Sequence, residues 1–347
     1  MNTTKHISKS TGLLTILVAG AASLIVTSMA QHQQAYASGG AGAAPDAVVS
    51  GQNFMNPLQV ALLYWYPAAL SASFPTGTQP VGLAFDGASV WVTNYLDNTV
   101  TKVRASDGYD ASQTFTVGVN PAGVAFDGAN IWVANSSAGN ITELQASNGA
   151  LVRTVDTVGI SPEQLAFDGA NMWVTNASSN TASKVRVSDG TVLLIVPVGN
   201  FPVGAACDGA NIWVANLSGN TVTKIRASNG TVLGTFPVGS QPNSLAFDGA
   251  NIWVTNSGSN TVTKIQASNG TVLGTFSVGT TPNGIAFDGA NVWVANGGSN
   301  SATRLRASDG ACVGACTFSV GSDPTAVAFD GAHIWVTNRS GNTVSKL

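Results

Sequence analysis

The hydrophobic and polar positions of this chain repeat with a period of about 40 residues. Each repeat contains GANIWV or a close variant, in which an apolar run follows the turn pair Asp-Gly. The tryptophans of these segments are Trp91, Trp132, Trp173, Trp213, Trp253, Trp293 and Trp335. Units of about 40 to 45 residues with four short strands are typical of propeller blades. Seven units therefore predict seven blades.

The fifth unit, from Ala246 to Asn283, shows how a blade is expected to form. Turn pairs Asp248-Gly249 and Asn269-Gly270 supply the positive φ that tight hairpins need. The predicted strands cover residues 244–247, 251–255, 261–266 and 271–278. The first two contain the runs LAF and IWV, which do not alternate and are typical of strands buried on both faces. Their tryptophans are predicted to pack between blades.

The two ends of the chain predict how the ring closes. The seventh unit stops after its third strand, whereas Ser73–Pro80 (SFPTGTQP) matches the fourth-strand segment Thr235–Pro242 (TFPVGSQP). An N-terminal strand that completes the last blade would remove an open sheet edge. The predicted fold class is therefore all-β: a seven-bladed β-propeller of four-stranded blades over residues 70–347, closed by an N-terminal strand.

Residues 1–37 have the features of a secretory signal peptide. Lys5 and Lys9 precede an apolar stretch, and residues 35–37 (AYA) fit a cleavage site between small residues. Residues 28–30 (SMA) are an alternative site, and an uncleaved membrane anchor is an alternative interpretation. We expect export, either secreted or to the periplasm or cell surface, with no membrane span after cleavage.

The sequence pattern of residues 38–69 predicts a linker and a short apolar helix. Small residues dominate up to Gly51, and an apolar run lies between Pro57 and Pro67. Proline favours the first turn of a helix and stops it at the other end. Such a helix would cap the disc or brace the seam, or would dock a partner, because its apolar surface would otherwise be exposed.

Composition narrows the function classes. Only 9% of the residues are charged, against roughly 25% in ordinary soluble domains, and the formal net charge is −3. A basic footprint for nucleic acid is therefore absent. Lys and Arg alternate with apolar residues on the predicted third strands, as in Lys224 and Arg226, which favours a wetter outer strand; a functional basic ring is the alternative. We expect a monomer.

The three cysteines have different predicted roles. Cys207 occupies a position that holds Phe in the other six units, which indicates a buried, inert thiol. Cys312 and Cys316 flank an expansion of the sixth unit, and export would permit a disulfide between them. Since the two would lie too far apart on one strand, this disulfide requires residues 313–315 to turn.

Signatures of catalysis or cofactor binding are missing from the sequence. It contains no nucleophile elbow, no phosphate-binding loop before a helix and no Cys/His set with zinc spacing. The seven aspartates of the first turns are expected to accept hydrogen bonds from turn amides rather than to form a cation ring. We predict no catalytic residue, no metal site and no cofactor.

The repeated FDGANIWVTN, followed by NTVTKI and NGTVLGT, resembles the YVTN/NHL-like propellers and the streptogramin (virginiamycin B) lyase-like group. The resemblance covers about residues 70–347 and implies a seven-bladed propeller. It also implies, for the lyases, His and Glu side chains near a Mg²⁺ ion over the channel. His333 replaces an Asn of the tight first turns and does not fall in the loops where that site would lie, so no catalytic residue carries over.

Comparing the repeats with one another leaves six candidate ligand-binding residues. The loops after the second and fourth strands share one face and consist mostly of Gly, Ser, Thr and Asn. The candidates that depart from this background are Tyr95, Asp97, Asp323, Arg339, Glu163 and Phe201. The first and seventh blades are neighbours after closure, so the first four candidates would form one polar-aromatic patch at the seam; random variation on a solvent face is the alternative.

The sequence as a whole predicts an exported, non-catalytic propeller that binds an unknown ligand or protein on this loop face. One alternative is a lyase-like or lactonase-like enzyme that depends on a metal ion such as Mg²⁺. Another is a structural or adhesive cell-surface protein.

Overall fold

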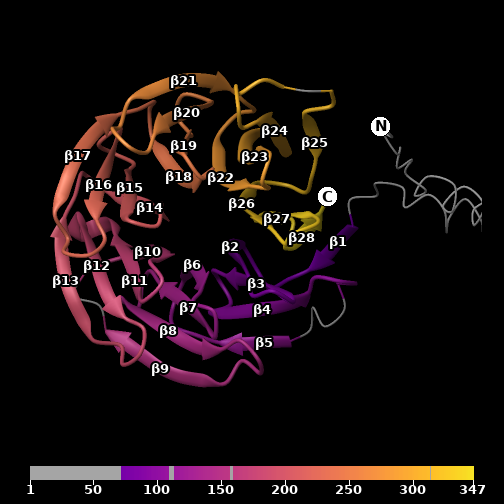
Figure 1. The fold of residues 1–347 in the computed structure, drawn as a ribbon. Helices are drawn as coiled ribbons and strands as arrows, with labels where there is room; N and C mark the ends of the chain where they lie inside the picture. Colours follow the sequence, from indigo (N-terminus) through magenta and orange to yellow (C-terminus); the bar gives the residue numbers. More distant parts are fainter. Residues whose placement is uncertain (1–71, 109–112, 157–158, 313) are drawn as a thin grey trace, which may run out of the picture. The chain divides into compact units, whose positions relative to one another are not determined.

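The computed structural model describes residues 72–108, 113–156, 159–312 and 314–347. The signal peptide, linker and apolar helix predicted over residues 1–69 lie outside this part. The described residues form seven four-stranded antiparallel sheets in a ring (Figure 1). They contain no α-helix, and no helix among them is long and apolar enough to cross a membrane. The predicted seven-bladed β-propeller is confirmed.

Each blade runs from an inner strand at the channel to an outer strand at the rim (Figure 1). The inner strands are β2 (Pro80–Phe85), β6 (Pro121–Phe126), β10 (Pro162–Phe167), β14 (Pro202–Cys207), β18 (Pro242–Phe247), β22 (Pro282–Phe287) and β26 (Pro324–Phe329). The second strands are β3 (Ser89–Asn94), β7 (Asn130–Asn135), β11 (Asn171–Asn176), β15 (Asn211–Asn216), β19 (Asn251–Asn256), β23 (Asn291–Asn296) and β27 (Ile334–Asn338).

The outer half of each blade follows the same order. The third strands are β4 (Thr99–Arg104), β8 (Asn140–Gln145), β12 (Thr181–Arg186), β16 (Thr221–Arg226), β20 (Thr261–Gln266), β24 (Ser301–Arg306) and β28 (Thr343–Lys346). The outer strands are β5 (Gln113–Thr116), β9 (Leu151–Asp156), β13 (Val192–Pro197), β17 (Val232–Pro237), β21 (Val272–Ser277), β25 (Thr317–Ser319) and β1 (Ala72–Pro75). Two short 3₁₀ turns, η1 (Ala177–Ser179) and η2 (Gly297–Ser299), follow β11 and β23. We number the blades 1 to 7 from β2 to β26.

One aspartate fixes the first turn of every blade. In blade 5, Asp248 Oδ1 accepts hydrogen bonds from the backbone N–H groups of Ala250 and Asn251, at 2.9 and 2.6 Å. Its Oδ2 accepts the indole Nε1–H of Trp253 at 2.8 Å. The other six blades repeat the bond to tryptophan at 2.7 to 3.0 Å. The predicted role of these aspartates in the turns is therefore confirmed, and the bond to tryptophan adds to it.

The hydrophobic core lies between neighbouring blades. Trp213 of blade 4 packs in one cluster with Leu245 of blade 5, and its ring centroid lies 5.6 Å from that of Phe236 on the outer strand. Six of the seven tryptophans are fully buried, and Trp293 is 7% exposed. The second strands are buried along almost their whole length. The inner strands mix buried and half-buried residues, because they face the channel.

The N-terminal strand closes the ring as the sequence predicts. β1 pairs antiparallel with β28, and Phe74 lies opposite Val344 (Figure 1). The Phe74 ring centroid lies 5.5 Å from that of Trp335. Blade 7 then packs on Val90 and Val92 of blade 1 in a cluster equivalent to those between the other blades. Blade 7 therefore has four strands, like the other six blades.

The prediction of a wetter third strand is wrong for its lysines. Lys224 is 7% exposed, its Nζ lies 5.1 Å from the Trp213 ring centroid, and it donates to Ala267 O of the next blade at 2.6 Å. Equivalent contacts are made by Lys102, Lys184, Lys264 and Lys346. Alternation placed Lys and Arg on one face, but that face is covered near the lysine by the neighbouring blade. Arg226, two residues further on, is exposed.

Blade 2 has an acidic residue at the position that holds the lysine in five other blades. Glu143 takes the lysine position and is 1% exposed. Arg153 on the outer strand lies opposite it, with 2.7 Å between Nε and Glu143 Oε2, and donates through Nη2 to Ser188 O of blade 3 at 3.3 Å. An arginine from another strand thus replaces the lysine that links blades elsewhere. The pKa of Glu143 is raised by burial, which Arg153 partly offsets.

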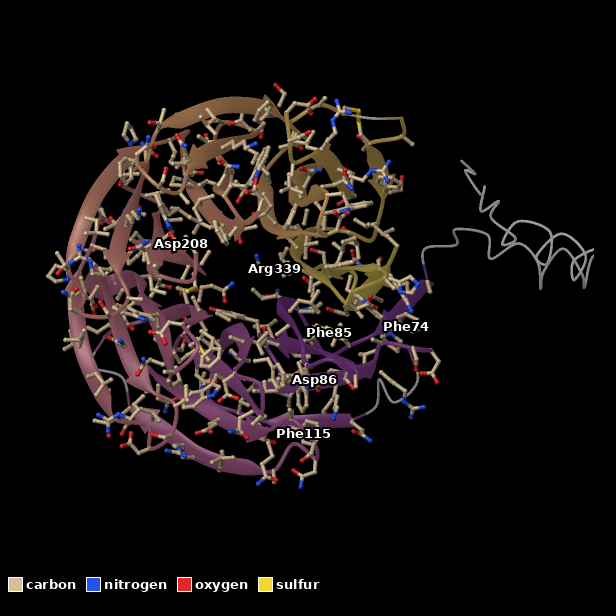
Figure 2. All side chains as sticks on the ribbon, viewed as in Figure 1. Phe74, Phe85, Asp86, Phe115, Asp208 and Arg339 are labelled. Carbon is tan, nitrogen blue, oxygen red and sulfur yellow. A yellow bond between two sulfur atoms is a disulfide. The ribbon has the colours of Figure 1, made fainter. Side chains whose placement is uncertain are left out.

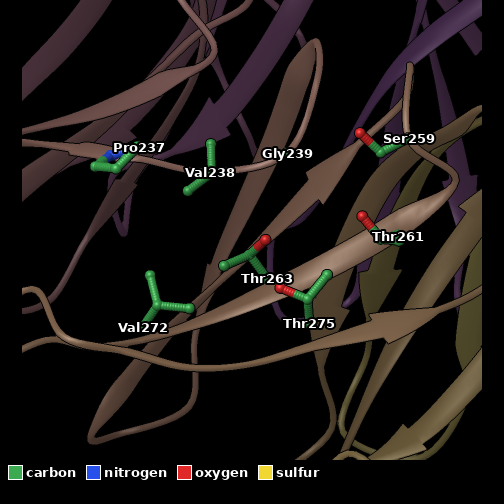
Figure 3. Close-up of a pocket in the computed structure, with 8 residues that line it drawn as sticks. All are labelled: Pro237, Val238, Gly239, Ser259, Thr261, Thr263, Val272 and Thr275. Atoms are coloured by element: carbon green, nitrogen blue, oxygen red, sulfur yellow. The ribbon is translucent and has the colours of Figure 1, made fainter.

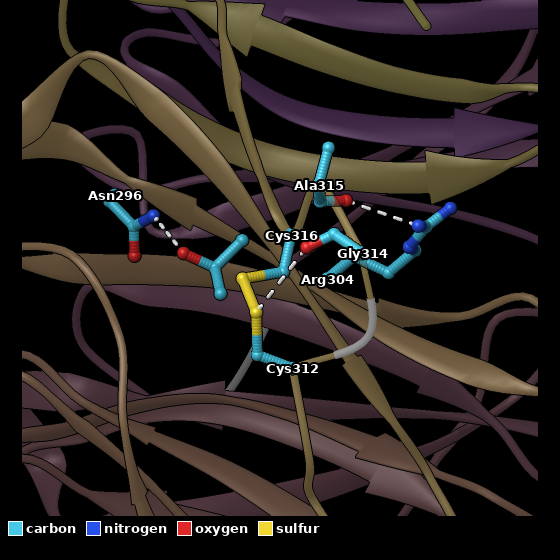
Figure 4. The surroundings of a disulfide bond; sticks show 7 residues. Asn296, Arg304, Cys312, Gly314, Ala315 and Cys316 are labelled. Atoms are coloured by element: carbon cyan, nitrogen blue, oxygen red, sulfur yellow. Dashed lines mark hydrogen bonds between the residues drawn. A yellow bond between two sulfur atoms is a disulfide. The ribbon is translucent and has the colours of Figure 1, made fainter.

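A disulfide joins Cys312 and Cys316 on the expanded turn of blade 6 (Figure 4). Their Cα atoms lie 5.5 Å apart, and Gly314 between them has a φ of +65°, so the segment turns as the pairing requires. The expansion leaves β25 with three residues. Cys207 is a free thiol that is half-buried rather than fully buried as predicted, and burial raises its pKa. Its inert role stays a prediction.

Candidate functional site

The inner strands enclose a cavity of about 460 Å³ at one end of the central channel. Each inner strand begins with proline, and the residues that follow it line this cavity. The positions directly after proline are Val81, Ala122, Glu163, Val203, Asn243, Asn283 and Thr325. Leu217 and Arg339, which follow β15 and β27, complete the lining from the loops. We call this side the loop face; it carries the loops after the second and outer strands.

Glu163 places one carboxylate in the cavity from β10. Its side chain is half-buried, and Oε1 accepts the hydroxyl of Ser136 from blade 2 at 2.8 Å. Among the described residues no cation pairs with it. Burial raises the pKa of Glu163, and the hydrogen bond from Ser136 opposes this only in part. A carboxylate held in this way favours a cationic or hydrogen-donating ligand.

Blades 5 to 7 contribute a polar arc to the same cavity. Asn243 Nδ2 donates to Asn283 Oδ1 at 3.3 Å, and Asn283 Nδ2 donates to Pro324 O at 3.1 Å. Thr325 donates to the backbone of blade 1 at Val81 O, 3.2 Å away. No described donor reaches Asn243 Oδ1, so this oxygen is available as an acceptor. Sequence reasoning missed this arc, although the position after proline holds five different residue types in the seven units and this variation could have revealed it.

Arg339 brings the second charge to the cavity from the loop after β27. Its side chain is exposed, and Figure 2 places it at the central opening of the ring. Nη2 lies 3.5 Å from Gln79 Oε1, and the Arg339 N–H donates to Asp323 O at 2.9 Å. Among the described residues no carboxylate pairs with its guanidinium group. Glu163 and Arg339 are therefore the two charged side chains of the lining, and neither has a counterion there.

The four residues of the predicted seam patch lie on connected loops. Tyr95 donates through its N–H to Gln79 O at 3.0 Å, and Gln79 contacts Arg339. Asp97, however, accepts the backbone N–H of Thr78 at 2.6 Å, which holds the loop that enters blade 1. The role of Asp97 in holding this loop therefore explains its presence without a ligand. The ligand-binding role of the four-residue patch stays a prediction.

Asp323 and Phe201 occupy equivalent positions before the inner-strand proline. Both have a positive φ, 54° and 55°, in a left-handed turn that the other repeats share. Asp323 Oδ2 accepts the hydroxyl of Ser340 at 3.4 Å. Phe201 is 40% exposed and does not line the cavity, but its carbonyl accepts the N–H of Leu217, which does. Phe201 thus lies on the rim of the site.

A second hollow of about 380 Å³ lies at blade 5 (Figure 3). Its lining combines Val238 and Val272 with the hydroxyls of Thr261, Thr263 and Thr275. The lining contains no charged or imidazole side chain, and its threonines belong to the regular repeat. It therefore lacks the charged groups that distinguish the channel cavity.

His333 lies far from these groups along its blade. β26 begins at the loop face and ends at the turn that carries His333, so this residue is exposed on the opposite face. Its Nδ1 lies 3.4 Å from Asp330 Oδ2, the aspartate of the same turn. The described residues contain no cluster of three His, Cys, Asp or Glu side chains that could hold a metal ion.

This chain is similar in structure to a streptogramin B lyase, with a TM-score of 0.67 and 18% sequence identity over 79% of this chain and 96% of that one. The chain has the propeller fold of the streptogramin B lyases. A catalytically inactive His-to-Ala variant of virginiamycin B lyase from Staphylococcus aureus, with Quinupristin, gives a TM-score of 0.67 and 19% identity over 79% and 97% of the two chains. Kuenenia stuttgartiensis hydrazine synthase gives 0.68 and 18% over 81% and 97%.

Neither a protein-family model nor a curated protein sequence matches this chain. At identities below 20% the structural likeness establishes the fold, and one propeller fold carries many unrelated functions.

Proposed function

We propose that this protein is an exported binding module without chemistry of its own, and that it takes its ligand at the loop-face end of the channel. The observation that carries the proposal is the cavity lined by Glu163 and Arg339, two opposite charges without counterions among the described residues. Pockets of roughly 300 to 1,000 Å³ with a few convergent polar groups are the usual form of small-molecule sites.

Two features support export. The chain begins with a basic, then apolar, then small-residue segment that is typical of secretory signals. The Cys312–Cys316 disulfide agrees with an oxidising destination. The low content of charged residues fits a secreted or periplasmic protein. It also fits the alternative of a structural protein at the cell surface, and retention in the cell wall would favour that alternative.

The nature of the site favours binding over the lyase-like or lactonase-like alternative. The lyase variant named above lost a histidine together with its activity, whereas His333 lies on the face opposite the cavity. Among the described residues no imidazole or second carboxylate lies within hydrogen-bonding distance of Glu163, so these residues offer it no general acid–base partner.

Native mass spectrometry of the protein purified from culture fluid tests the binding role. Val203→Trp should fill the cavity, whereas Val232→Trp, at an exposed position on the outer strand, is the matched control. We expect a bound small molecule on the parent and on Val232→Trp, and none on Val203→Trp. A bound mass that persists in Val203→Trp, or no bound mass on the parent, would contradict the proposal.

Incubation with a streptogramin B antibiotic tests the absence of lyase chemistry. We expect the lactone ring to remain intact with and without Mg²⁺, because no described histidine lies near the cavity. The measurement is mass spectrometry of the antibiotic. Ring opening that is lost in His333→Ala or on chelation would establish the enzyme instead.

A further inference from the structure

The two charges of the channel cavity lie on different sides of it. Glu163 comes from blade 3 and Arg339 from blade 7, and between them along the ring stand blades 1 and 2 in one direction and blades 4 to 6 in the other. No ion pair joins them, so their charged atoms are more than 4.0 Å apart. A ligand that neutralises both must therefore carry a positive and a negative group at separate ends.

Charged side chains that line a cavity are more stable with a counter-charge beside them. Glu163 and Arg339 therefore favour a ligand that carries a charge of opposite sign for each. Glu163 is partly removed from water, and among the described residues it receives one hydrogen bond, from Ser136. An ammonium group offers three donors and a full positive charge to such a carboxylate. Arg339, at the opening, presents a planar fork that matches a carboxylate in a bidentate way.

Between Glu163 and Arg339, the cavity wall carries polar side chains that can form hydrogen bonds with a ligand. Asn243 Oδ1 is free to accept, and Ser244, the next residue along β18, also lines the cavity. Opposite them, Val81 and Ala122 provide an apolar wall of small side chains. A backbone of amide groups with small side chains satisfies both walls, since its N–H groups can donate to Asn243 and its methyl groups can pack on the apolar side.

We propose that the cavity binds a short linear peptide, with its N-terminal ammonium at Glu163 and its C-terminal carboxylate at Arg339. This inference rests on the proposed binding function and names its ligand class. A volume of about 460 Å³ accommodates a peptide of a few small residues rather than a folded partner.

Isothermal titration calorimetry with three related probes tests the proposal on the unmodified protein. The probes are trialanine, N-acetyltrialanine, which lacks the ammonium, and trialanine amide, which lacks the carboxylate. We expect trialanine to bind and each capped form to bind at least tenfold more weakly. Capped forms that bind as well as trialanine, or no binding of trialanine, would overturn the peptide assignment.

Two isosteric variants then assign each end of the peptide. Glu163→Gln should weaken trialanine at least tenfold and abolish the preference over N-acetyltrialanine. Arg339→Gln should instead abolish the preference over trialanine amide. The control Arg226→Gln removes an exposed arginine on a third strand and should change neither. A merely structural role for either residue would weaken all three probes alike, which would also overturn the assignment.

The outcome for the peptide is separable from the outcome for the binding function. If native mass spectrometry shows a bound molecule that Val203→Trp removes, while trialanine does not bind, the ligand class is wrong and the binding function stands. If trialanine binds equally to the parent and to Val203→Trp, the peptide occupies another surface and the inference fails.

Discussion

At the residue scale, the aspartate of each first turn does more than shape a hairpin. One oxygen holds the turn amides and the other holds the indole of the buried tryptophan, so the turn and the core between blades depend on the same side chain. Such charge-assisted hydrogen bonds are stronger than neutral ones. The sequence predicts the turn at Asp248 and the burial of Trp253 separately. The hydrogen bond between their side chains depends on the folded geometry of the hairpin, which the sequence pattern does not show.

Trp253→Ala measures what one of these side chains contributes. Trp253 is fully buried, so its removal should cost about 3 to 5 kcal/mol of unfolding free energy, the usual range for emptying a large core site. Urea denaturation provides the measurement, and Trp253→Phe, which keeps an aromatic ring, should cost less. A loss below about 1 kcal/mol would show that the site repacks or is exposed.

Acid should weaken these turns. In the folded state burial raises the pKa of Asp248, but the bonds from Trp253, Ala250 and Asn251 outweigh it and the pKa is lowered from 3.8. The stability that this shift confers is fully present above pH 3.8 and is lost as the pH falls through the lowered pKa. We therefore expect Asp248→Asn to be less stable than the parent at pH 7, with a difference that shrinks in acid. A difference independent of pH would refute this.

At the element scale, the third strands of five blades link each blade to the next through one lysine that is buried or half-buried. The sequence showed the alternation but not which partner covers each face, because the neighbour comes from a unit 40 residues away. Alternation alone therefore predicts solvent around lysines that the neighbouring blade in fact covers. Blade 2, with Glu143 and Arg153, shows that the contact needs a donor to the next blade rather than a lysine at one position.

Arg153→Gly tests this exchange, since Gly234 and Gly274 occupy the equivalent positions in blades 4 and 5. It leaves the buried Glu143 carboxylate unpaired and should cost up to about 3 kcal/mol. The double variant with Glu143→Lys recreates the arrangement of blades 4 and 5 and should recover most of the loss. Denaturation of the single and double variants gives the coupling energy; additive effects would mean that the two residues act independently.

At the scale of the whole molecule, the ring holds together because its two ends share a blade. The missing fourth strand of the last repeat was enough to predict this closure, since the segment that fills it matches the other outer strands. The channel site was predictable only in part. Glu163 and Arg339 departed visibly from the repeat, but their place at one cavity, together with Ser136 and Asn243, required the radial arrangement of the blades.

Deletion of Ala72–Pro75 tests the closure. Loss of β1 exposes the edge of β28, so the variant should melt well below the parent and self-associate. Circular dichroism melting and light scattering are the measurements, and deletion of residues 38–51 is the control. A monomer that melts within about two degrees of the parent would refute closure by strand exchange.

The central claim, that the loop-face end of the channel is a binding site, is tested most directly by a crystal structure of the protein purified from culture fluid. We predict electron density for a small molecule that contacts Glu163 on one side and Arg339 on the other. A ligand bound on the face of the first turns, or an empty channel in protein that retains a bound mass, would contradict the account.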